Sequence, residues 1–326
     1  MEKRDKKYHF ICYGTDSYRQ YDLDLFANLD RSFFDEKGLY NEYNIKYIPE
    51  FEEKLEDQTF CSVFNSQTGA GYWIWKPFIV YDYLKRPTVN YGDLVIYSDL
   101  KFKPDPNAKV SQFESLHQKV KSTSHDILLP RFTDEHEFNC INKDHGSEFK
   151  IKTLNKFYTH PGSYKFFNIK DKAAFEEKFQ IWSVVYGIVK SEKSLAFFKK
   201  FRDIAASHPT IFTNNFDDFS IELSELKNFV SNLPDHYTVN GQTDIESLKN
   251  RILHNLTSSI QYKLSRNDQS VLNLLCEQEG LQAEDLNDHS NRYSCGGSGI
   301  QCESSKPHLA IPNLFDGIVK SSGYSK

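Results

Sequence analysis

The pattern of apolar and polar positions predicts a strand followed by a helix at the start of the chain. Apolar and aromatic residues run through 8–15 and again through 94–97, which is typical of buried strands. The segment 21–34 and the segment 192–206 carry apolar residues at helical spacing. Residues 179–190 are rich in β-branched residues and predict a central strand. The first strand and helix are typical of the opening of a nucleotide-binding half.

Shorter patterns predict the remaining elements. Strands are expected over 43–48 and 126–130, and helical segments over 51–64, 77–84, 110–120, 171–178, 219–233, 244–256 and 268–276. The stretch 131–160 mixes charged and polar residues with few apolar ones, so we expect surface loop and short helix there.

Composition divides the chain near residue 280. Residues 1–280 are expected to form one domain, since 326 residues allow one large core with an appendage. Residues 281–326 begin polar and rich in Gly and Ser, and return to an apolar stretch near 307–316. We therefore expect a C-terminal loop followed by a segment that docks back.

Charge and hydropathy exclude several classes of protein. The net charge of −5 disfavours a nucleic-acid binder. No apolar run approaches the roughly 20 residues that span a bilayer, and no signal-peptide pattern is present. We therefore expect a cytoplasmic protein without a transmembrane segment, and peripheral association with a membrane stays open. The six cysteines form no CxxC pair, so free thiols are expected, with a Cys295–Cys302 pair as the alternative.

Two residues in the first third of the chain suggest a phosphate site. Pro77 suits the first turn of a helix, which places Lys76 at the helix start. Asp99 directly follows the predicted strand 94–97. Ligands of open α/β sheets bind beyond the carboxyl ends of the strands. A lysine at a helix start and a carboxylate at a strand end therefore suggest a phosphate and its accompanying cation.

Three stretches of sequence together resemble one enzyme family. They are Gly71-Tyr-Trp-Ile-Trp-Lys-Pro77, Gly92-Asp-Leu-Val-Ile-Tyr-Ser-Asp99 and, far downstream, Arg266-Asn-Asp-Gln-Ser-Val-Leu-Asn-Leu-Leu275. In this order they resemble nucleotide-sugar glycosyltransferases of the GT-A fold from bacterial surface-polysaccharide clusters and large viruses. The last stretch is more distantly similar to retaining galactosyltransferases and glycogenin. The resemblance covers residues 7 to about 278.

The resemblance implies a GT-A, Rossmann-like fold with a mixed, mainly parallel sheet flanked by helices. It implies a nucleotide-sugar donor, with UDP-sugars favoured, and a glycan or glycoprotein acceptor. Tyr13, Gly14 and Thr15 would hold the base and ribose at the end of the first strand. The alternative for Gly14 is that it only permits a tight turn. Gln180 is placed like the amide with which related transferases hold the donor sugar.

The resemblance also implies roles for the downstream motif. Asp268, with Gln269 beside it, would act on the acceptor hydroxyl, as a base in an inverting displacement or as an orienting group in a retaining one. The alternative is a helix N-cap at Asp268 and a solvated Gln269. His308 is the best candidate to complete a metal shell, and the alternative that its sequence context favours is a plain surface histidine.

The leaving nucleoside diphosphate needs a cation, and Mg²⁺ or Mn²⁺ is expected. Related enzymes use Asp-x-Asp, whereas Tyr97-Ser98-Asp99 keeps only the final acid. A single carboxylate predicts that metal and donor bind together. Lys76 would add a positive contact on the diphosphate, and Tyr97 belongs to the same donor-binding group.

Two alternatives remain open. A nucleotidyltransferase would normally carry a Gly-rich phosphate loop, and the sequence has neither GxGxxG nor GxxxxGK[ST]. A catalytically degenerate transferase-fold domain that binds a glycan or a partner is also compatible, because Leu100 and Lys101 replace the family's Ala-Gly after Asp99.

Overall fold

The computed structural model describes residues 6–15, 33–66, 69–99, 102–105, 107–132, 137–142, 147–152, 154–155, 159, 161–213, 267–285, 300–301, 315 and 319–321. The helices predicted over 219–233 and 244–256 lie outside these residues, as does most of the helix predicted over 21–34.

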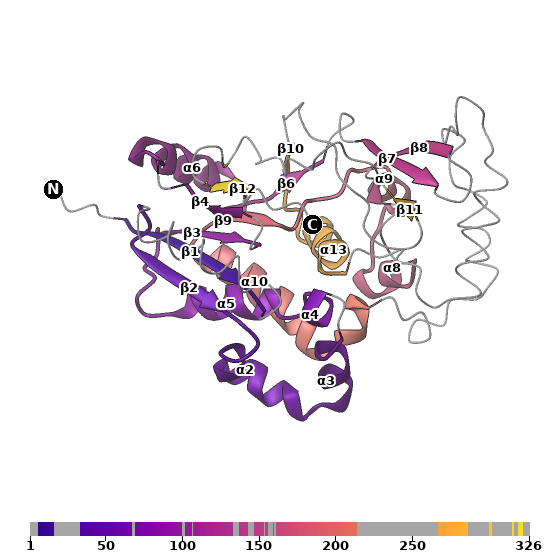
Figure 1. The fold of residues 1–326 in the computed structure, drawn as a ribbon, viewed down its shortest axis with the longest axis horizontal. Coiled ribbons are helices and arrows are strands. Elements are labelled where there is room, and N and C mark those ends of the chain that lie inside the picture. Colours follow the sequence, from indigo (N-terminus) through magenta and orange to yellow (C-terminus); the bar gives the residue numbers. More distant parts are fainter. Residues whose placement is uncertain are drawn as a thin grey trace.

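A central sheet with the strand order β2-β1-β3-β9-β5 organises the described part of the chain (Figure 1). Its strands are β1 (Tyr8–Tyr13), β2 (Glu36–Tyr40), β3 (Leu94–Ser98), β5 (Ile127–Leu128) and β9 (Val185–Val189). β1 pairs in parallel with β2 and β3, whereas β9 is antiparallel to both β3 and β5. Of these five strands only β9 is reversed, which confirms the mixed, mainly parallel sheet.

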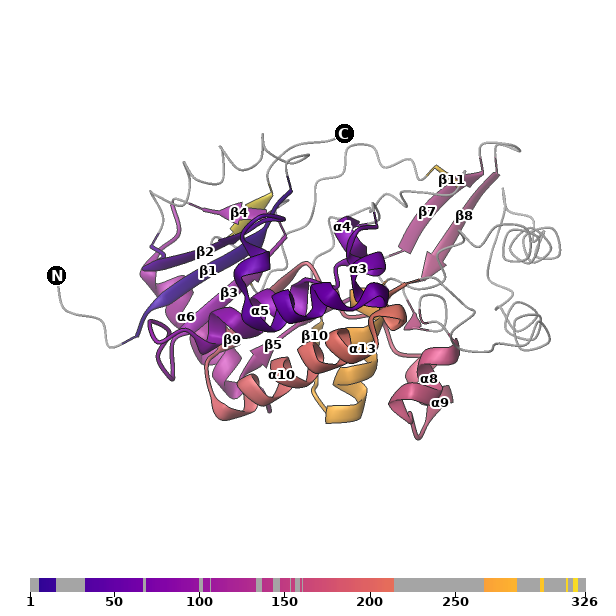
Figure 2. The ribbon, with the colours of Figure 1, turned by 90° about the horizontal axis from the view of Figure 1, so that it is seen from below.

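Alternate residues of the strands serve two separate cores. Ile11, Val95 and Ile188 join the core beneath α5 (Lys76–Lys85), α10 (Glu192–Ser207) and α13 (Asp268–Glu279). Figure 2 shows α5 and α10 side by side on that face of the sheet. Phe10 and Ile96 join the opposite core, to which α6 (Val110–Ser122) contributes. Helices on both faces explain why the strands are continuously apolar.

Smaller elements surround this framework. They are η2 (Ile45–Tyr47), α2 (Pro49–Glu52), η3 (Glu53–Glu56), α3 (Gln58–Phe64), α4 (Gly69–Tyr72), β4 (Phe102–Pro104), β6 (Pro130–Arg131), β7 (Glu137–Asn142), β8 (Ser147–Lys152), α8 (Pro161–Phe167), α9 (Lys172–Glu176), η4 (Pro209–Phe212), β10 (Glu284–Asp285), β11 (Ile300–Gln301) and β12 (Val319–Ser321). β12 pairs with β4, and Phe315 is buried in the second core.

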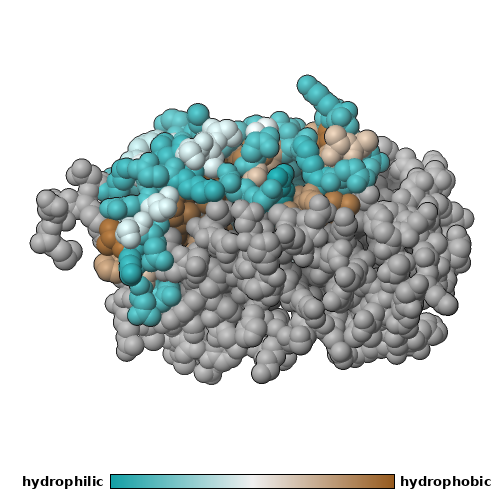
Figure 3. Space-filling view, turned by 90° about the horizontal axis from the view of Figure 1, so that it is seen from above, coloured by the Kyte–Doolittle hydropathy of each residue, from teal (hydrophilic) through white to brown (hydrophobic). Residues whose placement is uncertain are grey.

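None of the described helices is long and apolar enough to cross a membrane. The described residues on the face in Figure 3 are largely hydrophilic, with smaller hydrophobic areas between them.

The prediction of a strand over 43–48 is wrong. Residues 45–47 form the 3-10 helix η2, and the second strand is β2 instead. The side chain of Asn41 accepts from the backbone N–H groups of Tyr43 and Asn44, and Asn44 accepts in turn from the N–H of Asn41. Local bonds of this kind compete with strand pairing and turn the chain.

Two further predictions need correction. Part of 131–160, expected to be loop and short helix, is the antiparallel hairpin of β7 and β8. Its sequence alternates polar and apolar residues, as in Ser147–Lys152, which is typical of a strand. The high charge of the segment favours a loop prediction instead. The strand predicted over 179–190 begins only at Val185. Before it, Phe179 and Ile181 form isolated bridges and no continuous strand.

A left-handed turn precedes α5. Ala70, Gly71, Tyr72 and Trp73 have φ values of 50°, 92°, 54° and 58°. Residues other than glycine adopt this region at a cost, and consecutive examples are rare. The turn is fixed at its centre, where the N–H of Gly71 donates to the carbonyl of Ser66 at 2.8 Å. The Gly-Tyr-Trp sequence therefore sets the direction in which α5 begins.

Gly71→Ala is expected to destabilise the protein more than Gly92→Ala. Both glycines have a φ of 92°, but a Cβ at Gly71 would lie 2.4 Å from the carbonyl oxygen of Phe64, whereas a Cβ at Gly92 meets nothing within 4 Å. Strain alone costs on the order of 1–3 kcal/mol at either site. Urea unfolding of both variants isolates the added clash. Equal losses in the two variants would contradict it.

Candidate active site

A buried lysine lies where three distant segments meet. Lys76 begins α5, Asp99 follows β3, and Asp268 begins α13. The Lys76 side chain is 1% exposed, and its Nζ lies 2.7 Å from Oδ2 of Asp268 and 3.5 Å from Oδ1 of Asp99. The same ammonium donates to the carbonyl oxygen of Ser183 at 2.8 Å. Three oxygen atoms from three parts of the chain therefore surround one cation.

Aromatic rings enclose this cluster. The Nζ of Lys76 lies 5.3 Å from the centre of the Tyr97 ring and 5.9 Å from that of Trp75, within the range of a cation–π contact. Tyr97 and Tyr186 face each other in the register of β3 and β9, with ring centres 4.8 Å apart. The Tyr97 hydroxyl donates to Oδ1 of Asp99 at 2.5 Å. The rings exclude water from the ammonium and hold Asp99 in place.

The cluster carries more negative than positive charge, because two carboxylates face one ammonium. Burial disfavours the charged form of Lys76, but Asp268 and Asp99 outweigh it and hold the pKa of the lysine above its usual value. Burial raises the pKa of Asp268, against the opposing attraction of Lys76. A buried ion group of this kind persists only where each charge has a partner.

Two glutamines meet beside the charged cluster. Nε2 of Gln269 donates to Oε1 of Gln180, and both side chains are buried. Asn273, one turn further along α13, accepts from the N–H of Ile181 at 2.9 Å and donates to the carbonyl of Gln269 at 2.7 Å. These bonds hold the segment before β9 against α13.

Capping does not explain Asp268. The N-cap of α13 is Asn267, with a φ of 51°, and its side chain donates to the carbonyl of Phe212 at 2.6 Å. Asp268 instead turns toward Lys76, and Gln269 is 6% exposed. The capping and solvation alternatives are therefore wrong, because Asp268 pairs with Lys76 and the buried Gln269 bonds to Gln180.

The residues predicted to hold the nucleotide lie at the end of β1. Tyr13 stacks on Trp75, with ring centres 3.9 Å apart, and Gly14 donates its N–H to the carbonyl of Tyr40 at 2.9 Å. Gly14 is not among the described glycines with positive φ, so no left-handed turn requires it. Thr15 follows directly, and a nucleotide role for the three residues stays a prediction. His308 lies outside the described residues.

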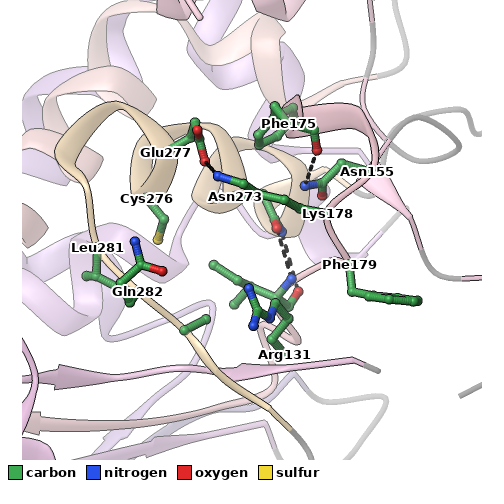
Figure 4. A pocket seen from close by; sticks show the side chains of 12 residues that line it. Arg131, Asn155, Phe175, Lys178, Phe179, Asn273, Cys276, Glu277, Leu281 and Gln282 are labelled. Carbon is green, nitrogen blue, oxygen red and sulfur yellow. Dashed lines mark hydrogen bonds and ion pairs between the residues drawn. The ribbon is translucent and has the colours of Figure 1, made fainter. Parts of the chain in front are cut away.

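A small polar pocket lies on the Asn273 side of α13 (Figure 4). Its charged side chains are paired: Arg131 with Asp285, and Lys178 with Glu277. Figure 4 shows Lys178 extending across the pocket toward Glu277. The pocket therefore offers no free charge of its own among the described residues that line it.

The described residues contain no group of three or more His, Cys, Asp or Glu side chains arranged to hold a metal ion. Asp99 is the carboxylate of the cluster with access to solvent, with 21% of its side chain exposed. One oxygen of Asp99 accepts from Tyr97, and no described residue bonds to the other.

Sequence reasoning anticipated Lys76, Tyr97, Asp99 and Asp268, which the structure brings together, and Gln180 and Gln269, which bond to each other. Sequence reasoning missed Ser183 and Tyr186 at the cluster and Asn273 beside the two glutamines. Only Asn273 had a signal, since it belongs to the downstream motif.

No protein-family model matches the chain, and no curated protein matches it. Among solved structures, it is similar to the apo form of mouse xyloside xylosyltransferase 1 with a TM-score of 0.36 and 10% sequence identity. That similarity covers 86% of this chain and 84% of the mouse protein. A TM-score of this size does not establish a shared fold, so only the residues of the site bear on function.

Proposed function

We propose that the protein is a glycosyltransferase that moves a sugar from a nucleotide sugar, with UDP-sugars favoured, to a carbohydrate acceptor. One observation carries this proposal. Lys76, Asp99 and Asp268 come from motifs far apart in the sequence, yet they form one buried cluster just beyond the carboxyl end of β3. Ligands of α/β sheets bind at such an edge.

The cluster can position an acceptor hydroxyl. In transfer, the acceptor oxygen bonds to the anomeric carbon, the bond from that carbon to the diphosphate oxygen breaks, and the hydroxyl proton must leave. Asp268 would accept this proton or orient the hydroxyl, and Lys76 fixes the carboxylate in one position at 2.7 Å. A fixed group near the reacting atoms contributes through orientation and proton transfer.

The oxygen atoms of the site that could bind a metal fit a weakly held divalent cation. Asp99 offers one oxygen without a described partner, and Mg²⁺ commonly takes one or two carboxylates together with substrate phosphates. Asp99 would hold Mn²⁺ or Mg²⁺ together with the diphosphate, and His308 stays a proposed further ligand. When bound, the ion supplies positive charge for the leaving diphosphate.

Asp99→Ala is expected to abolish metal-dependent donor binding and to leave the protein folded, because Lys76 keeps Asp268 and the Ser183 carbonyl as partners. Titration with nucleoside diphosphate plus Mn²⁺ measures the loss. Asp99→Asn is the matched control for shape, since it keeps an oxygen for the Tyr97 hydroxyl. Unchanged affinity in Asp99→Ala would remove this residue from the metal role.

The first experiment is a thermal-shift panel. The protein is melted with UDP-, GDP-, CMP- and dTDP-sugars, each with and without Mn²⁺. A ligand of the folded state raises the Tm by an amount that depends on its concentration over its Kd. A shift that needs one nucleotide together with the metal supports the proposal, and release of nucleoside diphosphate then tests turnover.

A second candidate is a non-catalytic domain that binds a glycan. The observation that favours it is the small number of possible metal ligands, because Asp99 is the one cluster carboxylate with solvent access among the described residues. Binding of glycans without any release of nucleoside diphosphate would support this candidate over the first.

A further inference from the structure

Two consecutive residues just before β9 contact each charged residue of the cluster. The carbonyl oxygen of Ser183 accepts from Nζ of Lys76 at 2.8 Å, and the carbonyl oxygen of Val184 accepts from the backbone N–H of Asp99 at 2.8 Å. The side chain of Ser183, which is buried, is a hydrogen-bond partner of Asp268. The pair of residues therefore joins the start of α5, the end of β3 and the start of α13.

Further bonds hold this segment against α13. Nε2 of Gln269 donates to Oε1 of Gln180, and the N–H of Ile181 donates to Oδ1 of Asn273 at 2.9 Å. Gln180, Ile181 and Ser183 thus each bond to the helix. A side chain whose backbone is fixed in this way holds its partner in a defined place.

The contacts that Ser183 and Val184 make with the cluster differ in kind. Those with Lys76 and Asp99 come from backbone carbonyls, which every residue type provides. The contact with Asp268 comes from a side-chain hydroxyl, which alanine lacks. A substitution of Ser183 therefore removes the bond to Asp268 and leaves the other two contacts in place.

The hydroxyl adds a second contact to a carboxylate that already has one. Oδ2 of Asp268 pairs with Nζ of Lys76 at 2.7 Å. One contact allows a carboxylate to pivot about the bonded oxygen, whereas a second contact fixes its orientation. A hydroxyl that donates to the carboxylate also favours its charged form, against the burial that raises the pKa of Asp268. Both effects suit a group that must accept a proton in a defined direction.

The Ser183 side chain is also a hydrogen-bond partner of Tyr186. A hydroxyl has one proton to donate and lone pairs with which to accept. Ser183 can therefore accept from the phenol of Tyr186 while it donates its own proton to the carboxylate of Asp268. The two contacts are compatible, and the charged acceptor is the stronger one.

We infer that Ser183 is a positioning residue whose hydroxyl orients the Asp268 carboxylate toward the acceptor hydroxyl. This inference rests on the proposed glycosyltransferase function, in which Asp268 acts on the acceptor. Ser183 itself touches neither the donor nor the acceptor and acts through Asp268.

Ser183→Ala is expected to slow sugar transfer at least about tenfold, the size expected for loss of a hydrogen bond to a charged group. The Kd for the nucleotide sugar with Mn²⁺ should stay the same, because the backbone contacts with Lys76 and Asp99 remain. Ser194→Ala is the matched control. Ser194 is also buried, but its hydroxyl donates to the carbonyl of Val189 at 2.9 Å, so neither quantity should change.

A double variant separates action through Asp268 from a general loss of structure. Ser183→Ala should slow Asp268→Asn far less than it slows the unmodified protein, because the carboxylate that the hydroxyl orients is already absent. Rates of transfer are measured for the unmodified protein, both single variants and the double variant with the same donor. The Tm of each protein without ligand verifies that it is folded.

The outcomes separate the inference from the function on which it rests. If no nucleotide sugar binds or reacts with the unmodified protein, the proposed function fails and the inference fails with it. If the protein transfers sugar and Ser183→Ala does so at the same rate, only the inference is overturned. Equal losses of rate and affinity in Ser183→Ala, or the same relative loss of rate in the Asp268→Asn background, would indicate a structural role and would also overturn it.

Discussion

Lys76→Met is expected to be the most destabilising single substitution in the site. Methionine nearly matches the length of the lysine stem, but it leaves Asp268 and Asp99 without the ammonium that faces both. Removing one partner of a buried ion pair costs about 3–5 kcal/mol, because the remaining charge is uncompensated. Urea unfolding at neutral pH measures the loss.

The same helix offers a matched control. Lys85 lies at the end of α5, its side chain is 45% exposed, and it pairs with Glu50 at the surface. Exposed pairs contribute about 0–1 kcal/mol, so Lys85→Met should change stability little. Equal losses in the two variants would show that Lys76 is not the cation that stabilises the cluster.

The pH dependence of the Lys76→Met defect has a definite sign. Burial already raises the pKa of Asp268, and loss of Lys76 removes the attraction that opposes this rise. A carboxyl whose folded pKa is raised binds more protons in the folded than in the unfolded state between the two pKa values, so stability falls as pH rises through that window. The free energy of unfolding of Lys76→Met should therefore lie closer to that of the unmodified protein at pH 5 than at pH 8.

Much of the site could be predicted because each part has a local cause. The strand β3 is a short apolar run that ends at Asp99, and Pro77 marks the start of α5 beside Lys76. Both signals depend on a few neighbouring residues. The contact of Asp268 with Lys76 and its place near Asp99 depend on the tertiary fold. In the sequence, only the resemblance of the downstream motif indicates that Asp268 belongs to the site.

The missed residues have a common physical reason. Tyr186 belongs to the site because β9 runs antiparallel to β3 and places it opposite Tyr97. Nothing in the sequence of either strand indicates this register, so the sequence alone predicts that Tyr186 is an ordinary core aromatic residue. The role of Ser183 is similar, since it binds Lys76 through its backbone carbonyl and not through its side chain.

The incorrect elements arose where local bonds or composition outweighed periodicity. Residues 43–48 look apolar enough for a strand, but the reciprocal bonds of Asn41 and Asn44 turn the chain into a 3-10 helix. The hairpin of β7 and β8 alternates as strands do, yet its charged residues favoured a loop prediction.

Asp268→Asn is expected to reduce sugar transfer far more than donor binding. Asparagine keeps the shape and one oxygen near Lys76 but cannot accept the acceptor proton, and general base catalysis contributes about 10²–10⁴-fold. The Kd for the nucleotide sugar should change only a few-fold, because the diphosphate is proposed to lie at Asp99. The rate of transfer and the Kd are measured on the same preparation.

The comparison of rate and affinity distinguishes two roles for Asp268. If the carboxylate serves only as the counter-ion of Lys76, its loss disturbs Asp99 through the shared ammonium, and transfer and donor binding should fall together. If it acts on the acceptor, the rate falls and the affinity is kept. Asp203→Asn, an exposed carboxylate paired with Lys199 on α10, should alter neither quantity. Because Lys76 touches both carboxylates, only a selective loss of rate assigns Asp268 to the acceptor hydroxyl.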